Sequence, residues 1–425
     1  MHLYFKIGLN TLYQVAARAL TAIVGLIATR IITSNLGIEG FGDYQIVITY
    51  VTLYWILTDF GLNAIAVREM AVNEERQSTF FSALITLRGF LGIVLLLLSL
   101  LILFFMPYEM VVKQAIVLAS STIFFQSIMG SANGLFQVRL RYDQQLISNL
   151  LGSAVSLSLV LLSSEREWGL VGFISAFISN SLVMATVNFL LARRWVKVRV
   201  SKDIKKLKYL FKETLPFGTA LLFSLATFKV DSLLLSTLSL NGIENNSAVG
   251  MYSLAYKVFE LILIIPVFFM NPVYPVLVRH LETSFQKFRS SVVNAESVLL
   301  LGSIAVIAVV YPFAPKIISL LAEGEGFMDS VNLLRILVLW SPLFFTTALL
   351  MWNLVTLKKQ KELIIIYAIG FLFNLSTNLY FLPMYHYWAA AYITGATEAL
   401  ILLLLLYFVG KSWIERKSLQ TTIAS

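Results

Sequence analysis

Charged residues inside apolar stretches are the part of this sequence that could do chemistry. Lys229 and Asp231 interrupt the run "ATFKVDSLLL" (226–235), whose other residues are typical of a membrane-spanning helix. Residues two apart point to different sides of a helix, so these two charges cannot neutralise each other along it. Each needs water, another helix or a bound solute, because a charge near mid-membrane costs about 2.5–3.5 kcal/mol on insertion scales.

Other ionisable residues lie at similar depth in predicted spans. At about 1.5 Å per residue, Arg18 and Arg88 lie near mid-membrane, and Lys257, Glu260 and Glu398 fall near the middle of their spans. Lys257 and Glu260 are three apart and can share a helix face and a salt bridge. Several cations inside spans favour an anionic solute, whereas carboxylates there can hold a coupling cation or a proton.

A second group of charges lies near span ends. Arg30 and Arg335 can extend toward the membrane surface, and the carboxylate of Asp59 can meet water. For every intramembrane charge the alternative is a structural pair that only holds the helix bundle together, and the sequence leaves this open.

Composition identifies the chain as a membrane protein. It has 425 residues, 58% hydrophobic and 13% charged, whereas soluble domains carry about 25% charged residues. It has no cysteine, which excludes disulfides, thiolate zinc sites and cysteine nucleophiles. The start "MHLYFK" is too weakly basic, and its apolar run too long, for a cleaved signal, so we expect a retained first helix.

Apolar stretches long enough to cross about 30 Å of hydrocarbon predict an all-α fold of about twelve spans. They lie near residues 9–34, 43–67, 79–105, 113–136, 144–163, 168–191, 214–240, 249–278, 290–311, 331–356, 362–382 and 387–410. With both termini cytoplasmic, cytoplasmic segments hold 23 Lys and Arg and opposite segments hold three. This asymmetry follows the positive-inside rule, so the net charge of +9 reflects topology and anionic lipid, with no nucleic-acid surface.

A basic stretch, "ARRWVKVRVSKDIKKLKYLFKETLPF" (192–217), divides the chain into two groups of six spans. We predict a first bundle at 1–191, a basic cytoplasmic linker at 192–213, a second bundle at 214–410 and a cytoplasmic tail at 411–425. Apolar residues at helical spacing alternate with lysines in the linker, which favours a helix lying on anionic lipid over a solvated loop.

The two halves repeat weakly. Gly42 and Tyr44 open the second span as Gly250 and Tyr252 open the eighth, and paired repeats with a site between them are transporter architecture. The eighth span also contains three prolines, which disturb the helix either as a static kink or as a hinge used in gating. These hinge candidates are Pro266, Pro272 and Pro275.

Motifs in both halves resemble a known family. "ITSNLGIEGFGDYQ" followed by "LTDFGLNAIAVREM", then "LPFGTALLFSLATFKVDSLLLSTL", "AVGMYSLAYKVFE" and "SVNLLRIL", are similar to bacterial polysaccharide-export flippases of the O-antigen type. Each motif is weakly specific, but their order and spacing cover most of the chain. The resemblance implies the multidrug/oligosaccharidyl-lipid/polysaccharide exporter superfamily, with two six-helix bundles in a V around a central cavity.

The resemblance also implies a function. The substrate would be a polyprenyl-pyrophosphate-linked sugar unit, as in lipopolysaccharide synthesis, moved from the inner to the outer leaflet of the bacterial cytoplasmic membrane. A pyrophosphate suits Arg and Lys, so we predict headgroup binding by Arg18, Arg88, Lys229, Arg30 and Lys257. Ion or proton coupling is predicted for Asp231, Glu260, Glu398 and Asp59, with Na⁺ or H⁺ as the coupling ion and no other cofactor. Expected partners are anionic lipids and the polysaccharide polymerase and chain-length proteins.

Two other kinds of membrane protein share some of these features. A membrane-bound polysaccharide polymerase or ligase would resemble its family in a large external loop with catalytic Arg or His, whereas the longest external segment here, near 312–330, holds one lysine. The three histidines are scattered and no predicted span carries a metal-ligand pair at three- or four-residue spacing, so we predict no enzyme. A multidrug exporter of the same superfamily is the alternative transporter, although it would favour acidic, aromatic pockets for organic cations.

Overall fold

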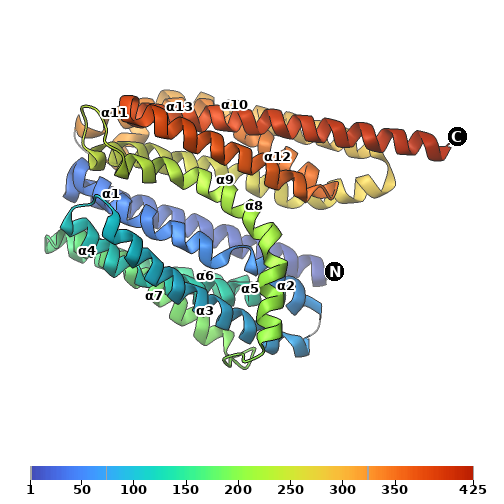
Figure 1. Ribbon diagram of the computed structural model, residues 1–425, viewed down its shortest axis with the longest axis horizontal. Coiled ribbons are helices and arrows are strands. Elements are labelled where there is room, and N and C mark those ends of the chain that lie inside the picture. The colour runs from blue at the N-terminus through green and yellow to red at the C-terminus, as the bar shows by residue number, and fades with distance from the viewer. Residues whose placement is uncertain (1, 73, 323–324, 425) are drawn as a thin grey trace. The chain divides into compact units, whose positions relative to one another are not determined.

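The computed structural model describes residues 2–72, 74–322 and 325–424, and this part of the chain is helical without a strand (Figure 1). It divides into two compact units. The first holds residues 1–225 with 321–323, and the second holds 226–320 with 324–425. The division falls inside one helix, downstream of the basic segment at which the sequence suggested a boundary.

Seven helices and the start of an eighth form the first unit. Helix α6 packs on α7 and α1, and α5 packs on α3 and α7. The helices are α1 (His2–Asp59), α2 (Leu62–Val72), α3 (Glu74–Phe105), α4 (Met110–Ala119), α5 (Ser121–Arg139), α6 (Tyr142–Glu165) and α7 (Gly169–Ala192).

Helix α8 (Ile204–Thr237) connects the units, and its second half begins the second one. There α12 packs on α13 and α9, and α11 packs on α9. The remaining elements are α9 (Asn245–Thr283), α10 (Phe285–Leu321), the short 3₁₀ helix η1 (Glu325–Phe327), α11 (Met328–Leu339), α12 (Ser341–Thr356) and α13 (Gln360–Ala424).

The helices account for the predicted spans. In the described residues, eight helices are long and apolar enough to cross a membrane, or nine if α11 and α12, bent by 42°, form one span. Two of these helices each contain two spans, because α1 is kinked at Gly37 and α13 at His386. Without a kink, the 58 residues of α1 would extend about 87 Å, far longer than one crossing. Together with α8 they make the expected twelve spans and confirm the fold class; the orientation of the termini stays a prediction.

Some spans are less regular than the sequence indicated. The span predicted at 43–67 is interrupted after Asp59, where Phe60 (φ 36°) and Gly61 (φ 74°) separate α1 from α2. A left-handed backbone is readily adopted by glycine but is strained for phenylalanine. The fourth span is divided between α4 and α5 at Ser120. By contrast, α9 continues through all three of its prolines, and α13 continues through the predicted tail.

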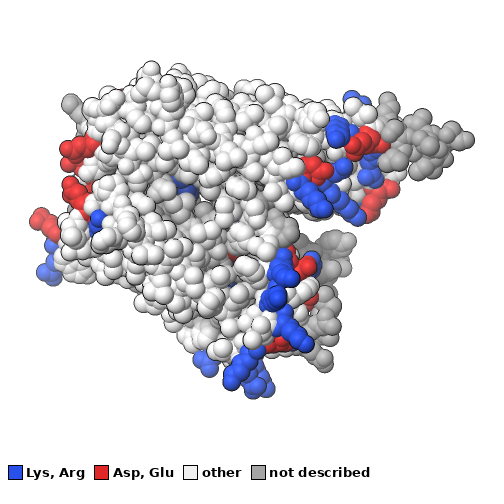
Figure 2. Space-filling model, in the orientation of Figure 1, with Lys and Arg blue, Asp and Glu red and all other residues white. Residues whose placement is uncertain are grey.

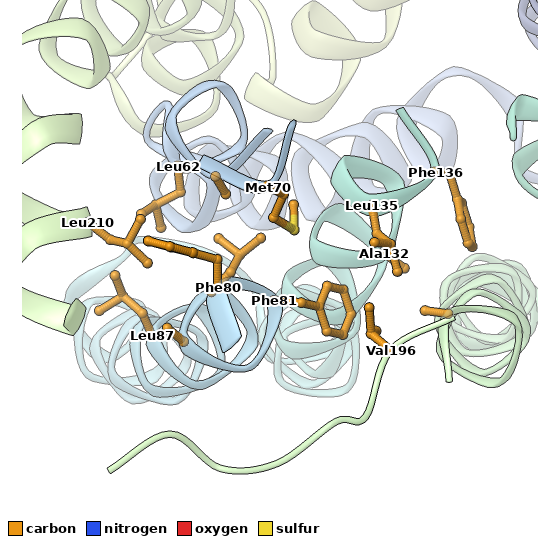
Figure 3. Packing of buried hydrophobic residues seen from close by; sticks show 14 of the residues in the cluster. Leu62, Met70, Phe80, Phe81, Leu87, Ala132, Leu135, Phe136, Val196 and Leu210 are labelled. Carbon is orange, nitrogen blue, oxygen red and sulfur yellow. The ribbon is translucent and has the colours of Figure 1, made fainter. Parts of the chain in front are cut away.

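Hydrophobic packing anchors the basic segment to the first unit. Val196 and Leu210 are buried in one cluster with residues of α2, α3 and α5, such as Met70 and Phe81 (Figure 3). In Figure 1 the first turns of α8 lie across the ends of the first unit's helices instead of running parallel to them. The segment is therefore part of this unit and not a loose tether.

A ladder of hydroxyl groups adds polar contacts to this packing. Three hydroxyl side chains spaced four residues apart on α3 accept hydrogen bonds from every second residue of the extended segment after α7. The two spacings match, because four helical residues rise about 6 Å and two extended residues about 6.6 Å. The backbone N–H groups donate to the hydroxyl oxygens in three pairs: Lys197 to Ser78 (3.3 Å), Arg199 to Ser82 (3.2 Å) and Ser201 to Thr86 (2.9 Å).

Charged side chains complete the attachment. The guanidinium carbons of Arg139 and Arg141 each lie 5.0 Å from the ring centre of Trp195, which follows α7. At the start of α8, the backbone N–H of Lys206 bonds to Asp203 and holds the pKa of this exposed carboxyl below its usual value. Further on, α8 meets the end of α2 through Tyr209 with Glu69 (3.0 Å) and Glu213 with Arg68 (3.1 Å).

One face of the first turns of α8 is exposed. Ile204, Phe211 and Leu215 are exposed and lie on one side of the helix, next to exposed lysines at 205, 208 and 212. In Figure 2, Lys and Arg gather at this end of the first unit, while its middle is white. The arrangement is that expected of a helix at an anionic lipid surface.

Candidate functional site

Asp231 lies in a buried nest of neutral hydrogen-bond donors. It is 2% exposed, and it accepts hydrogen bonds from Tyr252 on α9 (3.0 Å) and from Thr394 (2.9 Å) and Asn378 (2.8 Å) on α13. Asn378 also donates to the side-chain oxygen of Asn374, one turn earlier (3.1 Å). Every hydrogen bond described for this carboxylate comes from an uncharged group.

Lys229, two residues earlier on α8, faces a different neighbour. Its Nζ lies 2.8 Å from Glu260 Oε1 on α9, with the lysine side chain 27% and the glutamate side chain 44% exposed. The predicted partner of Glu260 was Lys257, on its own helix; the ion pair described for Glu260 is instead with Lys229. Lys229 and Asp231 thus have different described partners, as expected for charges two residues apart that cannot neutralise each other along the helix.

Two further carboxylates of the second unit bind hydroxyl groups. Glu398 on α13 is buried and accepts a hydrogen bond from Thr347 on α12. Glu296 on α10 accepts a hydrogen bond from Thr346 on α12 (2.5 Å), the residue before Thr347. The other carboxylate oxygen of Glu296 is buried without a hydrogen-bond partner in the described structure. Sequence reasoning singled out Glu398 but missed Glu296, which lies within the ninth predicted span.

Arg88 is a deeply buried cation of the first unit. Arg88 on α3 is 1% exposed and pairs with Asp59, at the end of α1, whose side chain is 49% exposed. Sequence reasoning assigned these residues to different roles, headgroup binding and coupling, and the structure brings them together. Arg18 is exposed on α1 and Arg30 is half-buried farther along the same helix.

No metal cluster is evident in the part of the chain that the structure describes: no three His, Cys, Asp or Glu side chains gather there. In the second unit, Asp231, Glu398 and Glu296 each accept hydrogen bonds from hydroxyl or amide groups. The signal for Asn374 and Asn378 was present in the sequence as two amides four residues apart in an apolar span, "FNLSTNLY".

Solved structures with the same fold define the class of protein. A structure described as "Lipid II flippase MurJ, inward closed conformation" matches with a TM-score of 0.77 and 16% identity, over 95% of this chain and 89% of that chain. An inward-facing multidrug resistance MATE family transporter of the MOP superfamily matches with a TM-score of 0.73 and 17% identity, over 95% and 96%. A MOP superfamily transporter from Pyrococcus furiosus gives 0.63 and 14%, over 96% and 95%. The chain thus has the fold of MOP superfamily transporters.

A family profile supplies the particular assignment. The profile described as "Polysaccharide biosynthesis protein" matches residues 7–281, so the chain belongs to this family. The resemblance seen in the sequence motifs is confirmed, and the chain is a multi-pass protein of the bacterial inner membrane. The related structures are named as a flippase and transporters, in agreement with the expectation of a transport protein rather than an enzyme. No curated protein matches the sequence.

Proposed function

We propose that this chain moves a polyprenyl-pyrophosphate-linked oligosaccharide from the inner to the outer leaflet by alternating access. The observation that carries the proposal is the match to the polysaccharide biosynthesis family. The fold shared with a flippase of lipid II supports a lipid-linked saccharide as substrate. A polysaccharide polymerase and chain-length proteins would be the partners that use the delivered unit.

The cations proposed for the pyrophosphate differ in how accessible they are. Arg18 is exposed, and Lys257 and Arg30 are half-buried. Lys229 is partly exposed beside Glu260, whereas Arg88 lies behind Asp59. Arg18 is thus the most exposed of these cations, whereas Lys229 and Arg88 each pair with a carboxylate that is more exposed than the cation, Glu260 and Asp59.

The second unit supplies the proposed coupling group. Asp231 is buried among hydroxyl and amide groups, and an intramembrane carboxylate whose described hydrogen bonds all come from uncharged groups is suited to take up Na⁺ or H⁺. Binding would neutralise the carboxylate of Asp231. An ion that binds one conformation of the transporter more tightly shifts the equilibrium toward that conformation. Glu398 and Glu260 remain additional candidates in the same unit.

Flipping in reconstituted vesicles tests the proposal. The wild-type protein should move a fluorescent polyprenyl-pyrophosphate-linked sugar between leaflets, faster under an imposed Na⁺ or proton gradient. Arg18→Ala and Lys229→Ala should each lower the rate at least tenfold at matched protein amounts. Lys316→Ala, which removes a charge from an exposed position on α10, serves as the control. Wild-type vesicles that do not flip the lipid would refute the function.

Multidrug export is the second candidate, favoured by the fold shared with the MATE family transporter. It predicts that organic cations such as ethidium leave loaded vesicles in exchange for the coupling ion. The same vesicles decide between the two candidates: cation efflux without movement of the lipid-linked sugar would favour drug export.

A further inference from the structure

In the ion pair of the first unit, the carboxylate of Asp59 is exposed and the guanidinium of Arg88 is buried. Arg88 Nη2 donates to Asp59 Oδ1, and the side chain of Asp59 is 49% exposed while that of Arg88 is 1% exposed. Any solute that approaches Arg88 from the exposed side therefore meets Asp59 first.

The guanidinium of Arg88 retains unused hydrogen-bond donors. Its Nε and Nη1 atoms are buried and have no hydrogen-bond partner among the described residues. The group lies against α5 at Gly130, where an added Cβ would be 3.0 Å from Nη1 and 3.4 Å from Cζ. Space for the planar group thus depends on this glycine. An arginine fork suits two oxygens of a carboxylate or phosphate, and Asp59 occupies only one of its donors in the structure.

Asp59 lies at a point where the backbone can change direction. The next two residues, Phe60 and Gly61, both have positive φ and separate α1 from α2. Strained residues of this kind persist where surrounding structure holds them, and they are frequent in switch regions. A change of backbone angles at this break is one way in which the carboxylate could move away from Arg88.

We propose that Asp59 occupies, in the unloaded protein, the place on Arg88 that a substrate phosphate takes, and that phosphate binding displaces it. The inference rests on the proposed function, because it takes the substrate to be a pyrophosphate. The exchange keeps the buried guanidinium neutralised in both states, and an unpaired buried charge would be strongly destabilising. The second unit has the same order of exposure, with Glu260 more exposed than its partner Lys229.

Thermal unfolding of the purified full-length protein in detergent, with inorganic pyrophosphate as the probe, tests this exchange. Asp59→Asn keeps the shape of the side chain but leaves Arg88 without a counter-charge. The variant should unfold at a lower temperature than wild type without pyrophosphate. Added pyrophosphate should stabilise it by mass action, with an affinity at least tenfold tighter than that of wild type.

Two further variants control for charge and for the location of the anion. Glu109→Gln removes one negative charge before α4, where the side chain makes no capping hydrogen bond, and it should behave as wild type. The double variant Asp59→Asn/Arg88→Gln removes both charges of the pair and should lose the response to pyrophosphate.

The results that would overturn the proposal are specific. If pyrophosphate stabilises Asp59→Asn no more than wild type, the pair is only structural; if the double variant still responds, the anion binds elsewhere. Should Asp59→Asn accumulate poorly, recovery of folded protein with pyrophosphate present supports the exchange, and no recovery contradicts it. Flipping by the wild type is measured separately, so the proposed function and this exchange can fail independently.

Discussion

Asp231 on α8 and Asn378 on α13 are joined by a hydrogen bond of 2.8 Å, although 147 positions separate them in the chain. The bond connects the helix that links the two units to the long helix that ends the second unit. Tyr252 brings α9 to the same carboxylate. Three helices thus meet at one buried acidic group, and a change in its charge would act on all three.

Replacing Asn378 by Ala should therefore weaken both ion coupling and folding. The variant removes one neutral donor from Asp231 while Thr394 and Tyr252 remain. We expect gradient-driven flipping to fall about tenfold, and a lost hydrogen bond to a charged group to lower stability by about 1.5–3 kcal/mol. Flipping with and without a Na⁺ or proton gradient, at matched protein amounts, measures the first effect.

Asn332→Ala is the control for this variant, because Asn332 is exposed and its described hydrogen bond, from Arg335 (3.4 Å), lies on the surface. The coupling ratio is the rate of flipping with the gradient divided by the rate without it. If Asn378→Ala leaves this ratio unchanged while Asn332→Ala lowers it, the hydrogen bonds to Asp231 do not support ion coupling.

Asp231→Asn tests the same group directly. The neutral amide imitates a protonated or ion-bound carboxylate, so the variant should keep substrate binding yet stall the return between inward-open and outward-open states. Export should fall while the amount of protein in the membrane stays near wild type. If a gradient still drives flipping by this variant at the wild-type rate, Glu398 or Glu260 must be considered in its place.

The ion pair of Lys229 and Glu260 predicts a modest coupling energy. Both side chains are partly exposed, so solvent screening should reduce their interaction to about 1 kcal/mol or less. Lys229→Met, Glu260→Gln and the double variant form a thermodynamic cycle that isolates this term. Unfolding in mild detergent gives the stabilities, and a coupling energy indistinguishable from zero would show that the pair does not contribute to the fold. Lys257→Gln with Glu260→Gln provides the matched comparison for the pair expected from sequence.

The sequence predicted the helices and the charges in them, but not which charges meet. Hydropathy and the positive-inside rule depend on local composition, so they located twelve spans and the basic segment between them. The pairing of Lys229 with α9, and of Arg88 with the end of α1, depends on how helices far apart in sequence pack. The break after Asp59 was missed because "DFG" lies inside an otherwise continuous apolar run.

The basic segment shows the same limit. Its lysines and apolar residues predicted an interfacial helix, and the exposed face of α8 agrees with that prediction. The hydroxyl ladder could not be predicted, because Ser78, Ser82 and Thr86 are ordinary residues until the segment at 197–201 lies beside them.

Attachment of the basic segment to the first unit predicts the effect of Leu210→Asp. Leu210 is fully buried in the cluster of Figure 3, and an unpaired carboxylate there would be expelled toward water. The start of α8 should detach, so limited proteolysis should cut between residues 195 and 213 much faster than in wild type. Lys208→Asp changes an exposed neighbour and should leave the segment protected. Equal cleavage of Leu210→Asp and wild type would contradict the attachment.

Orientation across the membrane predicts which positions an impermeant thiol reagent can reach. The charge asymmetry places the segment at 197–202 in the cytoplasm and the connection between α8 and α9 outside. Because the chain has no cysteine, a thiol reagent labels only the single cysteine that is introduced. Lys202 and Asn241 are exposed and suit the two sides, whereas Asn245 holds the end of α8 through bonds to Leu235 and Leu238. On intact spheroplasts Asn241→Cys should react and Lys202→Cys should not, and both should react after the membrane is permeabilised. Labelling of Lys202→Cys alone before permeabilisation would require the opposite topology and would place Asp231 at a different depth from the cytoplasm.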